Sequence, residues 1–171
     1  IILDHHSSKD SLPKDCILVN PHVHDSPNAP WRHLSSVGLV FKLVHGLIKQ
    51  LRDEGDEAAH EFALKDHLDF VELGTIADLV PLLGENRILA SHGLLRLRSA
   101  HRPGINALLE VSGKSIGEDI SPFDVSFRLG PRINACGRLA NALLPINMLL
   151  SENWTECSKA ARKVDAFNRK R

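Results

Sequence analysis

Ile1-Ile2-Leu3-Asp4-His5-His6 is the stretch that points to the fold, because a short apolar run ends in three polar residues. Such a run is typical of a buried strand, and open α/β sheets place their ligands at the C-terminal edges of strands. Adjacent side chains on a strand point to opposite faces, so a site that uses both Asp4 and His5 requires a turn there. An imidazole and a carboxylate can bind a divalent ion or transfer protons, although an ordinary exposed histidine pair would read the same way.

Helical spacing of apolar residues dominates the rest of the chain. Residues 16–19 are a second candidate strand, and residues 21–30, rich in Pro, Asn, Asp and Ser, are a candidate loop. Ser35 or Ser36 can cap a helix that runs to about Arg52. Further helices are predicted at residues 58–73, 85–99, 103–111, 141–150 and 155–171, whereas residues 123–139 are mixed and interrupted by glycines. We therefore expect a helix-rich fold with few strands.

Charge is unevenly distributed along a chain whose net charge is zero. Residues 1–85 contain 14 acidic and 7 basic side chains, and residues 86–171 contain 7 acidic and 14 basic ones. An acidic half suits carboxylates that hold metal, and a basic half suits groups that hold phosphate. Surface charge without a function can be divided in the same way.

Cysteine and aromatic content exclude several kinds of site. Cys16, Cys136 and Cys157 form no CxxC pair, which argues against structural zinc and a disulfide framework and favours a reducing cytoplasm. With six Phe, two Trp and no Tyr, stacking on aromatic residues is not expected to dominate contacts with nucleic acid. The most apolar stretch, near residues 37–51, is interrupted by charged residues, so no membrane span is expected.

A carboxylate follows the apolar run Gly74-Thr75-Ile76-Ala77 at residue Asp78. A carboxylate in such surroundings is costly to bury without a cation or hydrogen bonds. Asp78 is therefore a candidate metal ligand, and the alternative is an aspartate that only caps a helix.

Residues 128–138 combine arginines with Gly and Pro, which permit tight turns and close approach to a ligand. Guanidinium groups bind phosphate through two hydrogen bonds, and an Asn can reach the same oxyanion. The candidate phosphate-binding residues are Arg128, Arg132, Asn134 and Arg138. Pairing of these arginines with surface acids is the alternative. His22, His24 and His33 match no zinc spacing and are expected to be solvated.

Taken together, these segments resemble the RecJ family of DHH phosphoesterases in kind and in order. The resemblance covers nearly the whole chain and rests on residues 3–6, 19–21, 37–43, 73–82, 84–87, 102–104 and 128–139, with 165–169 similar to the family's interdomain helix. The family implies a partial α/β core with a doubly wound, mostly parallel sheet. Residues 1–150 would form the C-terminal part of this DHH core, and residues 151–171 the start of the interdomain helix.

The resemblance also implies roles for individual residues. His5 and Asp78 would bind metal in a site for two Mn²⁺ or Mg²⁺ ions, with Asp78 able to bridge them. His6 would lie beside the scissile phosphate, and Asp4 would orient the histidines rather than bind metal. Imidazole ligands favour Mn²⁺ over Mg²⁺. The substrate-facing segment would be that of Arg128, Arg132, Asn134 and Arg138.

The activity implied is 5′-to-3′ exonuclease action on single-stranded DNA in repair and recombination, with a single-stranded-DNA-binding protein and a helicase as partners. The alternatives are a DHH phosphodiesterase for short oligonucleotides or cyclic dinucleotides, and a non-catalytic DHH-like scaffold. The ends of the chain, Ile1 and Arg171, suggest an internal fragment. Because the family's Asp-x-Asp motif and a further Asp would precede Ile1, we expect the chain to be inactive alone.

Overall fold

The computed structural model describes residues 1–7, 11–99, 102–115, 118–139 and 141–170, without the side chains of Arg138 and Leu139. The chain divides into two compact units, Ile1–Gly93 and Leu94–Arg171. This division does not coincide with the boundary expected at residue 150. That residues 151–171 lead to a further domain stays a prediction.

The first unit begins with a small parallel sheet, as expected for an α/β core. Strand β1 (Ile2–Leu3) pairs with β2 (Leu18–Val19), with Ile2 opposite Leu18. Backbone hydrogen bonds extend the pairing, and the Asp4 amide donates to the Val19 carbonyl at 3.1 Å. The expectation that this strand is buried is wrong, because Ile2 is 40% exposed. A ladder of two short strands leaves its faces largely open in the described residues.

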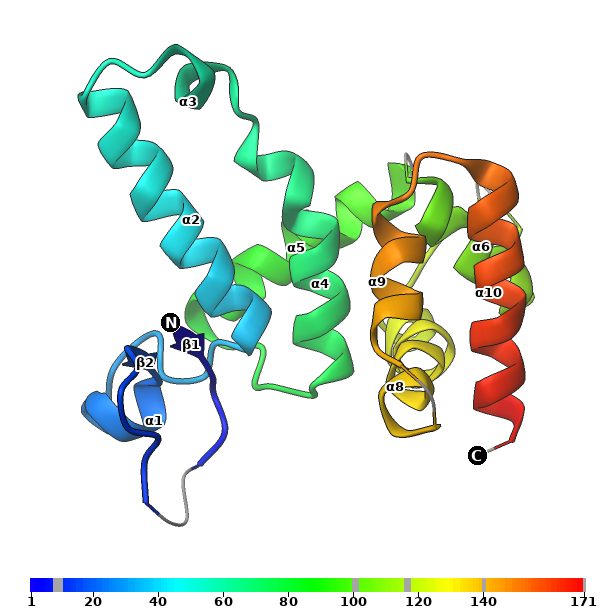
Figure 1. Cartoon of the computed structure of the whole chain (residues 1–171), viewed down its shortest axis with the longest axis horizontal. Helices are drawn as coiled ribbons and strands as arrows, with labels where there is room; N and C mark the ends of the chain where they lie inside the picture. Colours follow the sequence, from blue (N-terminus) through cyan, green and yellow to red (C-terminus); the bar gives the residue numbers. More distant parts are fainter. Residues whose placement is uncertain (8–10, 100–101, 116–117, 140, 171) are drawn as a thin grey trace. The chain divides into compact units, whose positions relative to one another are not determined.

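Helix α2 (Ser36–Asp53) begins where the sequence predicts. The Ser35 side chain caps it by accepting a hydrogen bond from the Gly38 amide. The preceding segment is not all loop, because α1 (Pro21–His24) forms one turn after the Asn20 cap. Figure 1 shows both strands and α1 beside the first turns of α2.

The helix expected at residues 58–73 is three separate elements. They are α3 (Glu57–Glu61), the 3₁₀ turn η1 (Leu64–His67) and α4 (Leu68–Ala77). Phe62 and Ala63 leave the helical region, with ψ angles of 116° and 78°, and this breaks the helix. In contrast, α4 continues through Gly74 and ends at Ala77, four residues later than expected.

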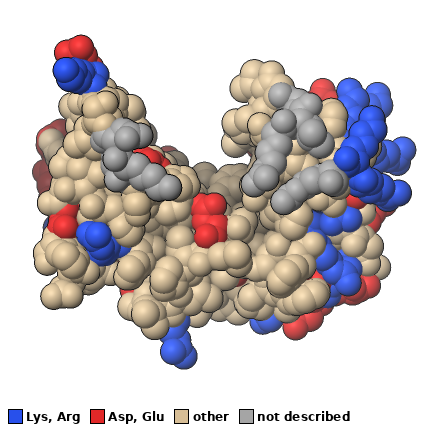
Figure 2. Space-filling view, turned by 90° about the horizontal axis from the view of Figure 1, so that it is seen from below, with Lys and Arg blue, Asp and Glu red and all other residues tan. Residues whose placement is uncertain are grey.

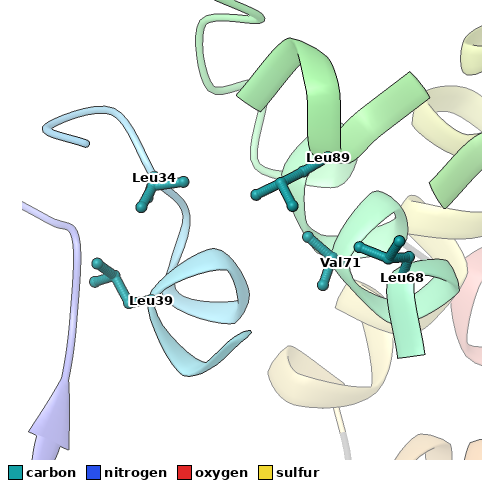
Figure 3. Packing of buried hydrophobic residues seen from close by; sticks show 5 residues of the cluster. All are labelled: Leu34, Leu39, Leu68, Val71 and Leu89. Atoms are coloured by element: carbon teal, nitrogen blue, oxygen red, sulfur yellow. The ribbon is translucent and has the colours of Figure 1, made fainter. Parts of the chain in front are cut away.

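The core of the first unit lies between α2, α4 and α5 (Gly84–Ser99), the helix that contains the boundary between the units. Figure 3 shows its five labelled side chains, which come from these helices and from the residue before the α2 cap. They are Leu34, Leu39, Leu68, Val71 and Leu89. Leu3 packs against this cluster and so attaches the β1 strand to it. Apolar burial of this kind is the main stabilising term in folding.

The second unit is helical in the residues that the structure describes. Its elements are α6 (Pro103–Val111), α7 (Pro122–Asp124), the π-helical turn η2 (Val125–Leu129), α8 (Gly130–Leu139), α9 (Leu143–Leu150) and α10 (Trp154–Arg169). Helix α10 packs on α6, α8 and α9. The mixed structure expected at residues 123–139 is therefore wrong, because this stretch is helical throughout.

Among the described residues, no helix is both long enough and apolar enough to cross a membrane. The three cysteines are free thiols, and Cys136 and Cys157 are buried.

Candidate metal centre

His5 follows β1 and turns its ring toward the start of α2. Its Nδ1 atom lies 2.9 Å from the Ser36 hydroxyl, and the Ser36 amide donates to the same nitrogen at 3.2 Å. The side chain is only 14% exposed, so these contacts fix the ring. The opposite ring nitrogen, Nε2, lies 3.6 Å from Oδ2 of Asp78.

Asp78 caps the C-terminus of α4 rather than lying inside an element. Its amide donates to the Gly74 carbonyl at 3.0 Å, and Leu79 then turns the chain with a positive φ of 54°. The carboxylate is 44% exposed. Asp78 therefore caps a helix, as in the alternative interpretation, and its carboxylate also faces the ring of His5. Its role as a metal ligand stays a prediction.

Asp4 holds the turn that brings the DHH triplet to one side of the strand end. Its Oδ1 atom accepts hydrogen bonds from the His5 amide at 2.8 Å and the His6 amide at 3.3 Å, and it lies 2.7 Å from His6 Nδ1. The Asn20 side chain donates to the His6 carbonyl at 2.9 Å and steadies the same turn. These contacts supply the turn that a site using neighbouring strand residues requires.

The electrostatics of Asp4 and His6 follow from their contact. The side-chain hydrogen bond between them is the main cause that lowers the pKa of Asp4 and raises the pKa of His6. His6 remains 76% exposed, and its ring lies 4.4 Å from that of His5 between centroids. Asp4 is therefore placed to orient His6, whose ring stays exposed. That this is its role in a site stays a prediction.

The donor atoms available here fit a divalent cation. Asp4, His5 and His6 each offer one ligand atom, and these atoms all lie within 4.8 Å of one another. Asp78 adds a second carboxylate beside His5. A mixture of imidazole nitrogen and carboxylate oxygen suits Mn²⁺ better than Mg²⁺, which prefers oxygen alone.

The loop histidines do not form a comparable cluster in the described part of the chain. The His22 and His33 rings meet edge to face with centroids 6.3 Å apart, and His24 is exposed. Burial and the nearby Arg32 lower the pKa of His22. The expectation that these residues bind no metal stays a prediction.

The arginine segment lies in helices rather than in the tight turns expected of it. Arg128 Nε lies 3.2 Å from Asp124, and Arg128 Nη1 donates to the Ser112 carbonyl at 3.3 Å. Arg132 Nε lies 3.0 Å from Asp165, and its Nη1 donates to the Arg128 carbonyl at 2.7 Å. The acid pairing considered as the alternative is therefore present. Each guanidinium has five N–H donors, so these contacts leave others for an anion.

Asn134 and Arg138 lie on α8 in the same segment. The Asn134 side chain is exposed, and the Arg138 side chain lies outside the described residues. No distance between these residues and the His5–Asp78 pair is defined, because the two groups belong to different units. Their substrate-binding role stays a prediction.

Comparison with known proteins gives a consistent result over the full length. No model of a protein family matches the chain. It is 41% identical over 175 residues to the single-stranded-DNA-specific exonuclease RecJ of Escherichia coli and 39% identical over 171 residues to that of Bacillus subtilis. These alignments cover 100% of this chain, 30% of the first relative and 20% of the second. Over its full length, the chain is therefore similar to a segment of the RecJ exonucleases.

Solved RecJ structures share the fold. A crystal structure of exonuclease RecJ bound to manganese matches with a TM-score of 0.77 and 27% identity, covering 98% of this chain and 40% of that one. RecJ from Thermus thermophilus in complex with Mn²⁺ matches with a TM-score of 0.76 and 26% identity, covering 95% and 23%. The helix-rich structure with its two parallel strands is therefore part of a RecJ-type α/β core.

Two residues that build the centre were not predicted from the sequence. Ser36 contacts His5, and Asn20 holds the backbone of His6. The sequence does indicate that each lies at the start of a helix, where backbone amides lack hydrogen-bond partners within the helix. What the sequence could not show is that these helix starts face the DHH turn.

Proposed function

We propose that this RecJ segment supplies part of a two-metal centre that hydrolyses phosphodiester bonds of single-stranded DNA. The observation that carries the proposal is the 3.6 Å separation between His5 Nε2 and Asp78 Oδ2. The chain spans about 30% of the length of the E. coli relative, so the activity of a whole protein is an inference from a part.

In this proposal His5 and Asp78 bind metal, and Asp78 bridges two ions through its two oxygens. Divalent ions of this kind activate water and stabilise the oxygens of an in-line displacement at phosphorus. His6, exposed beside this pair, contacts the scissile phosphate. Asp4 holds His6 in place through the 2.7 Å contact. Mn²⁺ is the preferred ion and Mg²⁺ the alternative, on the chemistry of the donors.

Substrate binding is assigned to the second unit. Arg128 and Arg132 each have N–H donors besides those that contact their acid partners, and Asn134 is exposed on the same helical segment. In Figure 2, blue side chains gather at the edge of the view where α10 lies, and the exposed cations of this helix include Lys159, Arg162 and Lys163. Positive charge on this unit supports binding of a phosphate backbone without regard to sequence.

The biological setting is proposed on the resemblance to the RecJ family and not on the geometry. We propose 5′-to-3′ digestion in DNA repair and recombination, in the cytoplasm, in cooperation with a single-stranded-DNA-binding protein and a helicase. Free cysteines in the structure are compatible with a reducing compartment.

A direct test is Mn²⁺ binding by the full chain, measured from the signal of free Mn²⁺ in electron paramagnetic resonance. His5→Asn and Asp78→Asn should each weaken binding, whereas His45→Asn and Asp53→Asn change exposed residues of α2 and should have no effect. Unchanged affinity in His5→Asn and Asp78→Asn would contradict the proposal, and failure of the unaltered chain to bind Mn²⁺ would favour a scaffold.

Activity can be tested in a chimera of the E. coli RecJ relative. Its matching segment, aligned over 175 residues, is replaced by this chain. We expect Mn²⁺-dependent release of nucleotides from single-stranded DNA, lost in His5→Asn and Asp78→Asn and kept in His45→Asn. Preference for dinucleotides over long strands would instead favour an oligonucleotide phosphodiesterase. The 171-residue chain alone is expected to bind metal without turnover.

A further inference from the structure

The start of α2 contacts His5, one partner of the proposed metal pair, and also the helix that leads to the other partner, Asp78. Ser36 contacts His5, while Ser35 lies 3.3 Å from Thr75 between hydroxyl oxygens that are both buried. Thr75 is on α4, three residues before Asp78. Through these two neighbouring serines, the start of α2 therefore contacts both His5 and helix α4.

The close approach of α2 and α4 makes this double contact possible. Gly74 lies against Val37, and a β-carbon at residue 74 would overlap the Val37 side chain. Any larger residue at position 74 would move α4 away from the serines. The packing thus fixes where Asp78 stands relative to Ser36 and, through Ser36, relative to the His5 ring.

The His5 ring has two neutral forms, and its surroundings distinguish them. The Ser36 amide can only donate, so its bond to Nδ1 requires the form with the proton on Nε2. Metal binding through Nε2 requires the other form, with the proton on Nδ1. The Ser36 hydroxyl can accept a hydrogen bond from Nδ1–H in that form, because a serine oxygen both donates and accepts hydrogen bonds. Of the two Ser36 groups, the amide is compatible with one ring form only, whereas the hydroxyl is compatible with both.

We propose that Ser36 is a positioning residue that sets the tautomer of His5. By accepting a hydrogen bond from Nδ1–H, its hydroxyl stabilises the form in which the Nε2 lone pair can bind a divalent cation shared with Asp78. The inference rests on the proposed function, since it concerns the same metal pair, but it assigns a role to a residue that does not itself bind metal.

The first readout is the tautomer of His5, observed by long-range ¹H–¹⁵N correlation in the full chain at pH 8. In the unaltered chain, addition of Mg²⁺ should convert the ring from the Nε2–H form to the Nδ1–H form. Ser36→Ala keeps the amide and removes the hydroxyl, so its ring should stay in the Nε2–H form. Ser36→Thr retains a hydroxyl and should restore the conversion.

The second readout is the Mn²⁺ dissociation constant of the full chain. Loss of a group that orients a ligand weakens metal binding by about 10- to 100-fold, and we expect a loss of this size in Ser36→Ala. Ser36→Gly removes the same hydroxyl and replaces Ser36→Ala in this measurement if Ser36→Ala fails to fold. Ser35→Ala is the matched control. It removes the cap of α2 and the hydrogen bond to Thr75, so it should lower the urea midpoint, and because the Ser36 hydroxyl remains, the His5 tautomer conversion should be kept.

Each outcome separates this inference from the proposed function. Weaker Mn²⁺ binding in His5→Asn but not in Ser36→Ala, with the tautomer conversion intact, would overturn the role of Ser36 and leave the metal pair standing. Normal binding in His5→Asn would overturn the metal pair itself. A lower urea midpoint in Ser36→Ala with unchanged tautomer and affinity would reduce Ser36 to a purely structural residue and overturn the inference.

Discussion

His5 Nε2 lies 3.6 Å from Asp78 Oδ2, so the polar residues that follow β1 and α4 meet at one point. Apolar packing holds the two elements together, because Leu3 packs against the cluster that contains Leu68 and Val71 of α4. A metal pair built in this way depends on the spacing of helices as well as on its own side chains. Changes in that spacing are expected to affect both stability and metal affinity.

Gly74→Ala tests the spacing of α2 and α4. The added β-carbon overlaps Val37, whose branched side chain has little freedom to move. We expect a loss of about 1–3 kcal/mol in the free energy of unfolding, measured by urea titration, together with weaker Mn²⁺ binding. Gly46→Ala on α2 meets nothing within 4 Å and should stabilise the chain by about 0.5–1 kcal/mol. If Val37→Ala fails to rescue Gly74→Ala, the overlap is not the cause.

Local signals in the sequence were sufficient for several elements of the fold. Helix α6 has the predicted bounds because Pro103 begins it and Gly113 follows it, and α2 begins at the predicted serine cap. The break between α3 and α4 was not predictable in this way. Phe62 and Ala63 are neither Gly nor Pro, and their non-helical conformation interrupts a stretch with continuous helical spacing.

The candidate site shows the same division between local and distant information. Pairing of Arg128 with Asp124 is an i, i+4 contact that helical spacing can suggest. Pairing of Arg132 with Asp165 joins residues 33 positions apart and requires the packing of α8 on α10. The His5–Asp78 pair is also distant in sequence, and it was predictable only through the resemblance to RecJ.

Glu72 is expected to make the stability of the chain depend on pH. It is 1% exposed on α4, and burial raises its pKa from 4.5 to about 7. Between these values the folded chain keeps a proton that the unfolded chain releases, so the free energy of unfolding falls as pH rises from about 4.5 to 7. The loss is complete above pH 7 and amounts to at most about 3 kcal/mol.

Urea titrations at pH 5 and pH 8 measure this effect of Glu72. Glu72→Gln cannot ionise, so it should be more stable than the unaltered chain at pH 8, and the gain should be much smaller at pH 5. Glu61→Gln changes an exposed glutamate of the same unit and should have no such effect. Equal gains for Glu72→Gln at both pH values would mean that ionisation is not responsible.

Asp165 of α10 contacts two arginines, Arg132 of α8 and Arg169 of α10 itself, and the two arginines differ in burial. Its carboxylate lies 3.0 Å from Arg132 and 2.7 Å from Arg169, whose side chains are 15% and 76% exposed. Asp165→Ala leaves the nearly buried Arg132 without its partner and should cost about 3–5 kcal/mol in the free energy of unfolding. Arg169→Ala removes an exposed partner and should cost less than about 1 kcal/mol. Similar losses for the two variants in urea titration would be inconsistent with this assignment.

The exposed cations of α10 are expected to bind single-stranded DNA through its phosphates. The side chains of Lys159, Arg162 and Lys163 are exposed to solvent, while those of Cys157, Ala161 and Val164 on the same helix are buried. Because each phosphate contact releases counterions, the triple change of these cations to Gln should lower affinity for oligo-dT. It should also reduce the slope of log K against log salt by about 2, at roughly 0.7 for each contact.

Fluorescence anisotropy with labelled oligo-dT at several salt concentrations measures both quantities in the full chain. The control changes Lys14, Lys49 and Lys65 to Gln, which removes the same charge from exposed residues of the acidic half. If affinity depended only on total charge, the two triple variants would bind equally well. A reduced slope in the α10 variant alone would locate the contacts on this helix, because the number of counterions released depends on which cations touch phosphate.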